Sequence, residues 1–550
     1  MGHRKPNPTN SDFDLLIIGG GITGAGAARD AARRGLRVVL VDQDDIASGT
    51  SSRSSKLVHG GLRYLEQGEV SLVFEAVAER RILQEIAPHL VRPLPFLLPV
   101  YSDSRRSLFT INIGMWLYDG LSLFRSHKIH SKLSAKKVLS KEPGLRSKGL
   151  KGAPVYYDCA TDDARLTLEN ALDAERAGAE VRTHSRVTRL IRNGTQVVAA
   201  EVLDRLSGEV STINAAAIVN ATGPWSDSTR GLDGSLAPER MRPTKGIHIV
   251  LDATRVPVQH AIVCLHPTDG RVFFTIPWGE QTYIGTTDTD FEGDPNDVAA
   301  DANDVHYLLD ATNDYFPNAN VGPEDVIATW AGVRPLVGQE EAGAESSVSR
   351  EHLIAVEPDG LITIAGGKLT TYRRMGAELI DKVVEVCKRN GHVLPEMRQA
   401  ETDLNPLPGA VGWPESEDCD TVASLIAAAA NDLIDAKCAR MLSQTYGMRG
   451  LDIAAMVVAD ESLATPLVPG RPEIEAQVIW AAAEELAATV SDVMIRRTQL
   501  FFRDKNQGLT AVERVAELLS SQLNWSKDET ARYAKEYRQE VQRSRDWQTV

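Results

Sequence analysis

The run Asp14-Leu-Leu-Ile-Ile-Gly-Gly-Gly-Ile-Thr-Gly24 decides the fold of the first part of this 550-residue chain. Its apolar start is typical of a strand buried on both faces, and this strand leads directly into a turn of glycines. The alanine-rich stretch 25–34 then predicts a helix, Gly35 predicts its end, and 38–42 predicts a second strand. The segment is therefore predicted to be a βαβ unit.

The glycines of this turn have the spacing G-x-G-x-x-G at Gly19, Gly21 and Gly24. This spacing permits a tight turn, a close approach of the backbone to a pyrophosphate, and close packing of helix on strand. Asp42 ends the second strand, where a carboxylate can accept hydrogen bonds from a ribose diol and would repel a 2′-phosphate. The pattern predicts FAD or NAD rather than NADP, and the alternative is a turn with a purely structural role.

Two later segments favour a flavin over a nicotinamide. Residues 215–223 form a strand of small residues that ends in Ala-Thr-Gly and continues into Pro224 and Trp225. Residues 361–372 again read as a strand, a double glycine and the start of a helix. The N-terminus of that helix can stabilise the negative charge that a flavin ring gains on reduction. Each segment alone is also compatible with ordinary sheet and turn.

The stretch 48–64 is too polar and glycine-rich for a core element. It follows the second strand, so its hydroxyls and amides are predicted to contact phosphate and ribitol. The alternative is a flexible serine-rich linker, which the closing His-Gly-Gly-Leu-Arg-Tyr makes less favourable.

Composition limits the function classes. A net charge of −15 argues against general nucleic-acid binding, because phosphate backbones require an excess of Lys and Arg. The five scattered cysteines indicate neither a disulfide framework nor a metal site, and fit a reducing, cytoplasmic setting. No signal peptide is apparent, and no segment supplies the roughly twenty apolar residues of a membrane span. Any membrane contact is therefore expected to be peripheral.

Taken together, the motifs closely resemble those of the respiratory FAD-dependent glycerol-3-phosphate dehydrogenases, over essentially the whole chain. The combination is far more specific than any single motif. Further likeness to this family lies at Tyr446-Gly447 and through residues 474–497. The matching stretches are Gly19–Gly24, Thr50–Tyr64, Asp158–Leu166, Asn220–Trp225, Lys245–Val250, Ile284–Asp288, Gly332–Leu336 and Gly366–Arg373.

The resemblance implies an α/β fold with three parts. The first is a Rossmann-like FAD-binding domain, a parallel sheet flanked by helices, expected over about 14–95, 150–230 and 331–394. The second is an interleaved antiparallel-sheet substrate domain, expected over about 96–149 and 231–330. After a linker rich in proline and glycine, a C-terminal α-helical domain is expected over 401–550.

The resemblance also implies the oxidation of sn-glycerol 3-phosphate to dihydroxyacetone phosphate, with FAD as cofactor and a membrane quinone as electron acceptor. A homodimer is also expected, and a quinone acceptor fits a peripheral attachment to the inner face of the cell membrane. Three alternatives stay open: a glycerol-3-phosphate oxidase that reduces oxygen, an amine or amino-acid oxidase, and a catalytically silent FAD-binding regulatory protein.

A hydride leaves the substrate carbon while a base takes the hydroxyl proton, so the site needs an anion clamp and a base. Guanidinium groups match phosphate oxygens with paired hydrogen bonds. His248 lies in an apolar strand and is the predicted base, with His59 and Asp288 as further candidates and a core histidine as the alternative. The resemblance places these residues at the substrate: Arg63, Tyr64, Lys245, His248, Asp288, Arg334 and Lys368.

The cofactor contacts implied by the motifs and the resemblance fall in five segments. They are Gly19, Gly21, Ile22, Thr23 and Gly24; Asp42 and Gln43; Thr50, Ser51, Ser52, Ser55, Lys56, His59, Gly60 and Gly61; Val187, Ala221, Thr222, Gly223 and Trp225; and Gly366, Gly367, Lys368, Leu369 and Thr370.

Residues 93–128 combine apolar and aromatic side chains with four cations, a mixture that suits a membrane interface. The alternative is that these residues fill the substrate-domain core or a dimer contact. The apolar members are Phe96, Leu97, Leu98, Phe109, Ile111, Ile113, Met115, Trp116, Leu117, Tyr118, Leu121, Leu123 and Phe124, and the cations are Arg105, Arg106, Arg125 and Lys128.

Overall fold

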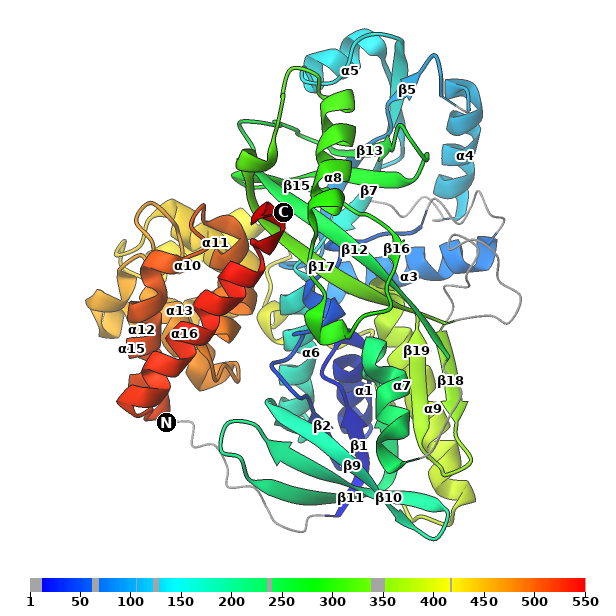
Figure 1. The fold of residues 1–550 in the computed structure, drawn as a ribbon, viewed down its shortest axis with the longest axis vertical. Coiled ribbons are helices and arrows are strands. Elements are labelled where there is room, and N and C mark those ends of the chain that lie inside the picture. Colours follow the sequence, from blue (N-terminus) through cyan, green and yellow to red (C-terminus); the bar gives the residue numbers. More distant parts are fainter. Residues whose placement is uncertain are drawn as a thin grey trace.

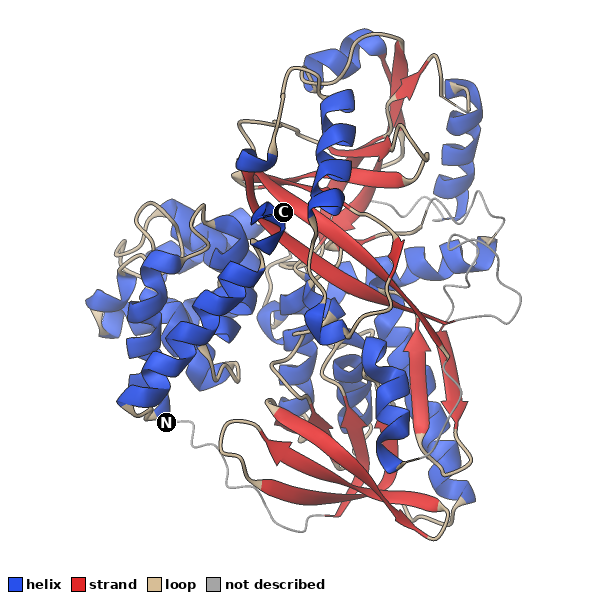
Figure 2. Ribbon diagram, viewed as in Figure 1, coloured by secondary structure: helices blue, strands red, loops and turns tan. Residues whose placement is uncertain are grey.

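The computed structural model describes residues 12–61, 69–104, 106–121, 128–234, 240–337, 352–415 and 418–549. Figure 1 shows three parts: a first sheet with the N-terminal βαβ unit, a second sheet beyond it, and a group of C-terminal helices beside both. Figure 2 shows that the C-terminal part is built from helices and that most strands lie in the two sheets.

The first sheet has the strand order β18-β19-β11-β1-β2-β8, with β1 (Asp12–Ile18) near its centre. Neighbouring strands from β19 to β8 are parallel, and β18 is antiparallel at the edge. The predicted Rossmann-like arrangement is confirmed. The other strands are β2 (Val38–Val41), β8 (Glu180–Arg182), β11 (Val210–Asn220), β18 (His352–Val356) and β19 (Ile362–Gly366).

The helix of the βαβ unit, α1 (Ile22–Arg33), starts three residues earlier than the sequence predicts and is followed by Gly35 with φ +95°. It packs against α6 (Asp163–Arg176) and α9 (Tyr372–Arg389). A Cβ at Gly26 would lie 2.7 Å from the ring of Tyr372, so glycine permits the close approach of α1 and α9. On the other side of the sheet, β9 (Ser185–Asn193) and β10 (Gln196–Asp204) form an antiparallel extension of β11.

The second sheet is largely antiparallel, as predicted, and its eleven described strands include β12 (Met241–Asp252) paired with β15 and β17. One pair, β4 with β13, is parallel. The remaining strands are β3 (Leu57–Val58), β4 (Arg92–Leu97), β5 (Val100–Tyr101), β6 (Ser131–Ser134), β7 (Leu150–Ala160), β13 (Ala261–Leu265), β14 (Val272–Trp278), β15 (Gln281–Gly285), β16 (Thr289–Asp290) and β17 (Val326–Val337).

The predicted domain limits stay a prediction, but strand pairing shows where the two sheets divide the chain. β4 and β7 pair with each other in the second sheet, although the sequence grouped most of β4 and all of β7 with the dinucleotide segments. Pairing between distant strands leaves no local signal in the sequence. The helices around this sheet are α3 (Val70–Ile86), α4 (Leu108–Leu121), α5 (Ala135–Lys141) and α8 (Ala302–Tyr315).

The C-terminal part is helical, as expected. A π-helical segment, η11 (Asp492–Arg497), precedes the short α14, and the apolar core of this part continues onto the second sheet, where Phe502 contacts Trp330 with ring centroids 5.5 Å apart. Its α-helices are α10 (Cys419–Ala429), α11 (Ala436–Tyr446), α12 (Gly450–Ala459), α13 (Glu475–Glu484), α14 (Leu500–Arg503), α15 (Val512–Leu523) and α16 (Lys527–Arg543).

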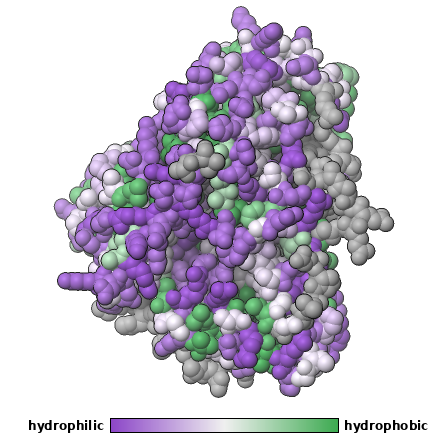
Figure 3. Space-filling view, viewed as in Figure 1, coloured by the Kyte–Doolittle hydropathy of each residue, from purple (hydrophilic) through white to green (hydrophobic). Residues whose placement is uncertain are grey.

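The surface seen in Figure 3 is mostly hydrophilic. None of the helices in the described part of the chain is long and apolar enough to cross a membrane. Of the apolar residues predicted at a membrane interface, Phe96, Leu97 and Met115 are instead buried in the core, at 1%, 0% and 1% exposure. Their interface assignment is wrong, because both faces of β4 and one side of α4 are covered by packing.

Candidate functional site

The glycine-rich turn forms a cradle between β1 and α1. A Cβ at Gly19 would lie 2.6 Å from the carbonyl oxygen of Ala221, and a Cβ at Gly24 would lie 1.9 Å from that of Gly19. No side chain fits at either position, so the glycines set the close packing of α1 on the sheet. The turn leaves the N-terminus of α1 available for a pyrophosphate, because helix N-termini bind anions.

Asp42 and the turn are joined directly. The backbone amide of Gly20 donates to Oδ2 of Asp42 at 2.6 Å, which fixes the carboxylate at the end of β2. Removal from water raises the pKa of Asp42 to about 6, while hydrogen bonds from the amides of Asp44 and Gly20 act against this increase. A ribose diol that donates to this carboxylate would add to those hydrogen bonds and favour the ionised form.

The described part of the serine-rich loop, residues 48–61, contacts both sheets. Ser51 Oγ accepts from the amide of Ile22 at 2.9 Å, at the start of α1. At the second sheet, Thr50 Oγ1 donates to Val333 at 2.6 Å, and Trp330 Nε1 donates to the carbonyl of Ser54 at 3.1 Å. The loop therefore holds the cradle against the face of β17.

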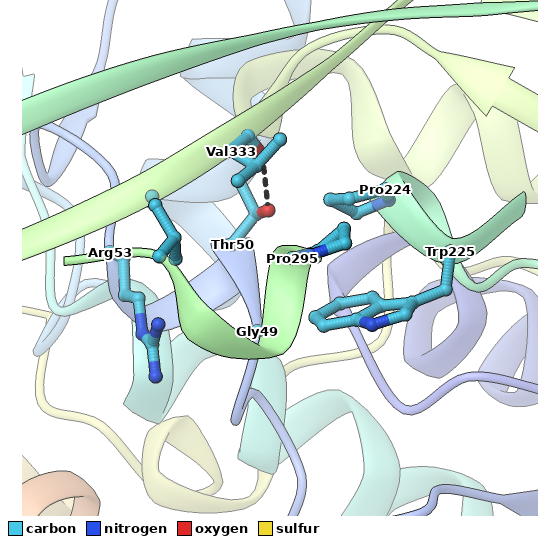
Figure 4. Close-up of a pocket in the computed structure, with 9 residues that line it drawn as sticks. Gly49, Thr50, Arg53, Pro224, Trp225, Pro295 and Val333 are labelled. Atoms are coloured by element: carbon cyan, nitrogen blue, oxygen red, sulfur yellow. Dashed lines mark hydrogen bonds between the residues drawn. The ribbon is translucent and has the colours of Figure 1, made fainter. Parts of the chain in front are cut away.

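A small cavity of about 10 Å³ lies beside this loop, next to Trp225 (Figure 4). The indole ring approaches Gly49 so closely that a Cβ there would lie 3.0 Å from it. Trp225 Nε1 is buried and has no hydrogen-bond partner among the described residues. Because an unpaired buried donor costs about 1–3 kcal/mol, the orphaned indole N–H points to an acceptor supplied by a bound molecule.

Two loops predicted beside the flavin are held together. The amide of His59 donates to Thr370 Oγ1 at 3.2 Å, and Asp158 Oδ1 accepts from the amide of Gly60 at 3.0 Å. Lys368 is half-buried and directly follows Gly367, whose φ is +86°. The structure therefore brings the predicted segments 59–61 and 366–370 to one place.

The paired strands β12 and β17 carry several predicted site residues on one face of the second sheet. Their register pairs Thr244 with Arg334, Gly246 with Gly332, and His248 with Trp330. Side chains at alternate positions share a face, so these pairs line the same side of the sheet. A Cβ at Gly246 would lie 2.4 Å from Nη2 of Arg334, so this glycine makes room for the guanidinium.

His248 is buried, at 2% exposure, and stacks on Trp330 with ring centroids 4.7 Å apart. Its Nε2 is 2.9 Å from Ser55 Oγ, and its Nδ1 has no partner among the described residues. Burial, with the positive charges of Arg334 and Lys56, lowers the pKa of His248 well below its usual value. The ring is therefore neutral at physiological pH and has a nitrogen able to accept a proton.

Arg334 is oriented by a set of oxygen atoms. Its Nη1 donates to Asp288 Oδ1 at 2.8 Å, and its Nη2 donates to Thr286 Oγ1 and to the carbonyl of Thr287, both at 3.0 Å. Asp288, a predicted alternative base, forms an ion pair with Arg334. The Arg334 side chain is 25% exposed.

Two predicted cations point elsewhere. Lys245 lies an odd number of positions from His248 and faces the other side of β12, where Asp301 and Asp304 bind it at 2.8 and 2.6 Å. The ammonium of Lys56 is buried against Asp163 at 2.6 Å, so its charge stabilises the serine-rich loop instead of facing the cradle. The direction of Lys245 follows from the alternation of side chains along a strand, which the sequence already gives. The pairing of Lys56 with Asp163 can be seen only in the folded structure.

Arg63 and Tyr64, both predicted at the substrate, lie outside the described residues. The side chain of Val187 lies in the apolar cluster behind β2, and Gln43 donates to Asn296 at 3.3 Å. Sequence reasoning missed the supporting residues Trp330, Thr286 and Asp158. The last two belong to matching stretches, but nothing local indicates which partner each of them orients.

Residues 14–373 match the family described as FAD dependent oxidoreductase, and residues 400–530 match the C-terminal domain of alpha-glycerophosphate oxidase. These two matches cover the two-sheet part of the chain and most of the helical part, respectively.

Named relatives match over nearly the whole chain. An aerobic glycerol-3-phosphate dehydrogenase of Staphylococcus haemolyticus strain JCSC1435 is 38% identical over 97% of this chain and 95% of its own. That of Staphylococcus aureus strain USA300 is 36% identical over 98% and 96%. The solved structure of glycerol-3-phosphate dehydrogenase from Bacillus halodurans, complexed with FAD, has a TM-score of 0.80 and 32% identity, and covers 98% of this chain and 96% of that one.

Proposed function

Because the chain belongs to the family of FAD-dependent aerobic glycerol-3-phosphate dehydrogenases, we propose that it oxidises sn-glycerol 3-phosphate to dihydroxyacetone phosphate and passes the electrons to a membrane quinone. The observation that carries this proposal is the row on β12 and β17, where a neutral buried His248 lies beside the oriented cation Arg334. A proton acceptor next to an anion clamp is what a phosphorylated secondary alcohol requires.

FAD is the cofactor, and the cradle fits it. The glycines at 19 and 24 exclude side chains, Asp42 is fixed for a ribose diol, and the N–H of Trp225 lacks an acceptor. We propose that the turn and α1 hold the pyrophosphate, that Asp42 binds the adenosine ribose, and that segments 59–61 and 366–370 hold the flavin ring. The flavin, when bound, accepts a hydride from the carbon that bears the substrate hydroxyl.

In the proposed reaction, the guanidinium of Arg334, whose position Asp288 and Thr286 fix, supplies positive charge for the substrate phosphate. Lys368, and by resemblance Arg63 and Tyr64, complete the anion clamp. His248 Nε2, which faces the hydroxyl of Ser55, takes the proton of the substrate hydroxyl. The positive charge of Arg334 and Lys56 and the burial of the ring keep His248 unprotonated until that step.

The proposed substrate is tested anaerobically on the purified yellow protein. Glycerol 3-phosphate is expected to bleach the flavin absorbance, and glycerol at the same concentration is not, because it has no phosphate for Arg334. Absence of bleaching by the phosphate ester would contradict the substrate, and bleaching by amines or amino acids would favour the corresponding oxidase. A protein that binds FAD without being reduced by any of these alcohols would be a regulatory one.

The acceptor is tested on the same reduced protein. A quinone analogue is expected to restore the flavin absorbance far faster than air does. The reverse order would make the protein an oxidase, an activity that the match of residues 400–530 also accommodates.

An exposed apolar face supports the membrane part of the proposal. On α4, Phe109, Ile113, Trp116 and Leu117 are 73%, 55%, 54% and 52% exposed, and Phe74 on the neighbouring α3 is 50% exposed. Aromatic side chains favour the headgroup level of a bilayer. Of the predicted cations, Arg106 and Lys128 are exposed in this region; Arg105, Leu123, Phe124 and Arg125, and the side chains of Tyr118 and Leu121, lie outside the described part.

This face is close to the proposed flavin loops. Further along α3, Glu79 accepts two hydrogen bonds from Arg373, which follows segment 366–370, at 2.9 and 2.5 Å. Phe74 lies five residues before Glu79, about 8 Å along the helix axis. We therefore propose that α3 and α4 lie on the inner face of the cell membrane and give the quinone a short route to the flavin.

The membrane proposal is tested by co-sedimentation with anionic liposomes at low salt. Replacement of Phe109 and Trp116 by serine is expected to weaken binding by at least about tenfold, since each buried aromatic contributes about 1.5–3 kcal/mol. Retention of full binding by that variant would contradict the assignment of this face. Light scattering in detergent tests the expected homodimer.

A further inference from the structure

The loop 42–47, between β2 and the serine-rich loop, is part of the cradle. Besides the hydrogen bond from Gly20 to Asp42, the amide of Ala47 donates to the carbonyl of Gly20 at 3.1 Å. Ile46 packs so close to Gly20 that a Cβ there would lie 2.6 Å from its side chain. The position of loop 42–47 therefore sets both the carboxylate for the ribose and the shape of the glycine turn.

The C-terminal domain contacts this loop at Asp45, whose side chain is fully buried, at 0% exposure. Arg497 donates to Oδ2 and Oδ1 of Asp45 at 2.7 and 2.8 Å, and Arg496 donates to Oδ2 at 2.5 Å. Consecutive residues of an α-helix do not face the same partner. Both arginines nonetheless meet one carboxylate here, and they lie in the π-helical segment η11, a type of distortion that is frequent at functional sites.

Further hydrogen bonds of these arginines, and of Asp492 and His184 beside them, extend this network. Arg496 Nη2 donates to Asp492 Oδ1 at 2.6 Å, and Arg497 Nη2 donates to the carbonyl of Glu485 at 2.6 Å. On the other side of Asp492, Oδ2 lies 3.1 Å from Nε2 of His184, whose own amide donates to the carbonyl of Asp44 at 2.7 Å. The loop is thus held directly by η11 at Asp45, and indirectly at Asp44 through His184, whose ring contacts Asp492 of the same segment.

We propose that η11 is a clamp through which the C-terminal domain sets the affinity for FAD, with Asp45, Arg496 and Arg497 as positioning residues. They act through loop 42–47, which orients Asp42 and Gly20. The proposal rests on FAD as the cofactor and on the proposed place of its ribose at Asp42, and is independent of the substrate and the electron acceptor. Loss of the clamp is expected to weaken FAD binding about 5- to 150-fold, the range typical of coupled sites.

The first test measures the dissociation constant of FAD for the apoprotein by flavin fluorescence, in the wild type, in Arg497→Met and in a matched control, Arg471→Met. Arg471 forms a fork with Glu473 of the C-terminal domain, at 3.1 and 2.9 Å, with side chains 11% and 3% exposed, and its hydrogen bonds within the described residues do not reach loop 42–47 or η11. Both variants are expected to lower Tm, and only Arg497→Met to raise the Kd. An unchanged Kd in Arg497→Met, or an equal rise in both, would overturn the clamp.

The second test needs no variant and covers the case in which Arg497→Met does not fold. Coupling between sites is reciprocal, so FAD must strengthen the clamp if the clamp strengthens FAD binding. In hydrogen exchange on the full-length wild type, FAD is expected to protect residues 489–499 as well as 18–24 and 42–47, and to leave α15 unchanged. Protection confined to the cradle itself would overturn the proposal.

Discussion

The cradle, proposed to bind the FAD pyrophosphate and ribose, and the face of β12 and β17, proposed to bind the substrate, are built in different ways. In the cradle, the decisive groups are backbone amides and missing side chains within residues 19–42, and one carboxylate. On the face, they are side chains far apart in the sequence: pairing of β12 with β17 brings His248 and Arg334 to one face, and Ser55 joins them through a hydrogen bond to His248.

Because of this difference, the two regions are expected to respond differently to substitution. A backbone cradle tolerates no added atom at Gly19 or Gly24, but apart from Asp42 it does not depend on side-chain chemistry. The face depends on the chemistry of each side chain and on the neighbours that orient it. Substitutions in the cradle are therefore expected to remove the cofactor, and substitutions on the face to leave a yellow protein that reacts slowly.

The largest effect is expected for Gly24→Val. The new Cβ would meet the carbonyl oxygen of Gly19 at 1.9 Å, so α1 must move away from β1 and the cradle must open. The protein is expected to purify without flavin and to lose stability by about 1–3 kcal/mol. The ratio of flavin to protein absorbance and the Tm measure this. Gly231→Ala, with no atom within 4 Å of the new Cβ, is the control, and retention of flavin by Gly24→Val would contradict the cradle assignment.

The same contrast explains how far the sequence predicted the molecule. The βαβ unit, the order of Gly19, Gly24 and Asp42, and the strand that carries His248 follow from local patterns, and the structure confirms these elements. The pairing of β4 with β7 and the stacking of Trp330 on His248 join distant segments, and periodicity holds no information on them.

Ion pairs were a second feature that the sequence could not predict. The sequence shows that Lys56 and Lys245 are present near the motifs, but not that they form ion pairs with Asp163 and Asp301. For Lys245 the alternation of β12 would have been sufficient to exclude the face of His248. The cations Arg496 and Arg497 gave no sequence signal beyond family likeness, since their partner Asp45 lies 451 and 452 residues away.

His248→Gln is the sharpest test of the face. The variant keeps a polar side chain of similar reach but removes the basic nitrogen, so kcat is expected to fall by about 10²- to 10⁴-fold, the usual contribution of a general base. Stopped-flow reduction of the bound flavin measures it. His266→Gln removes another buried histidine of the second sheet, one that stacks on Tyr307, and is expected to change the rate little. Equal rates in His248→Gln and the wild type would exclude His248 as the base.

A smaller effect is expected for Arg334→Lys. Lysine keeps the charge but has a single nitrogen, so it cannot contact both Asp288 and Thr286 and hold its charge where the guanidinium lies. Loss of one charged hydrogen bond corresponds to about 10- to 100-fold in kcat/KM, mainly through KM. Steady-state kinetics with glycerol 3-phosphate test this, with Arg255→Lys, whose partner is Asp325, as control. A fall in kcat at constant KM would assign Arg334 to the flavin instead.

The smallest effect concerns acid stability. The pKa of His248 is lowered in the folded protein, so between the unfolded value near 6.5 and the lower folded value only the unfolded chain takes up the proton. Stability is therefore lost as the pH falls below about 6.5, by about 1 kcal/mol between pH 6.5 and 5.5 from this group alone.

Denaturant unfolding at pH 7.5, 6.5 and 5.5 measures this loss, and His248→Gln is expected to lose correspondingly less over the same interval. Equal losses in the two proteins would mean that the ring is not kept neutral by its surroundings. The comparison would then fail at its central point, because a face that depends on side-chain chemistry must hold its base in the reactive form before substrate arrives.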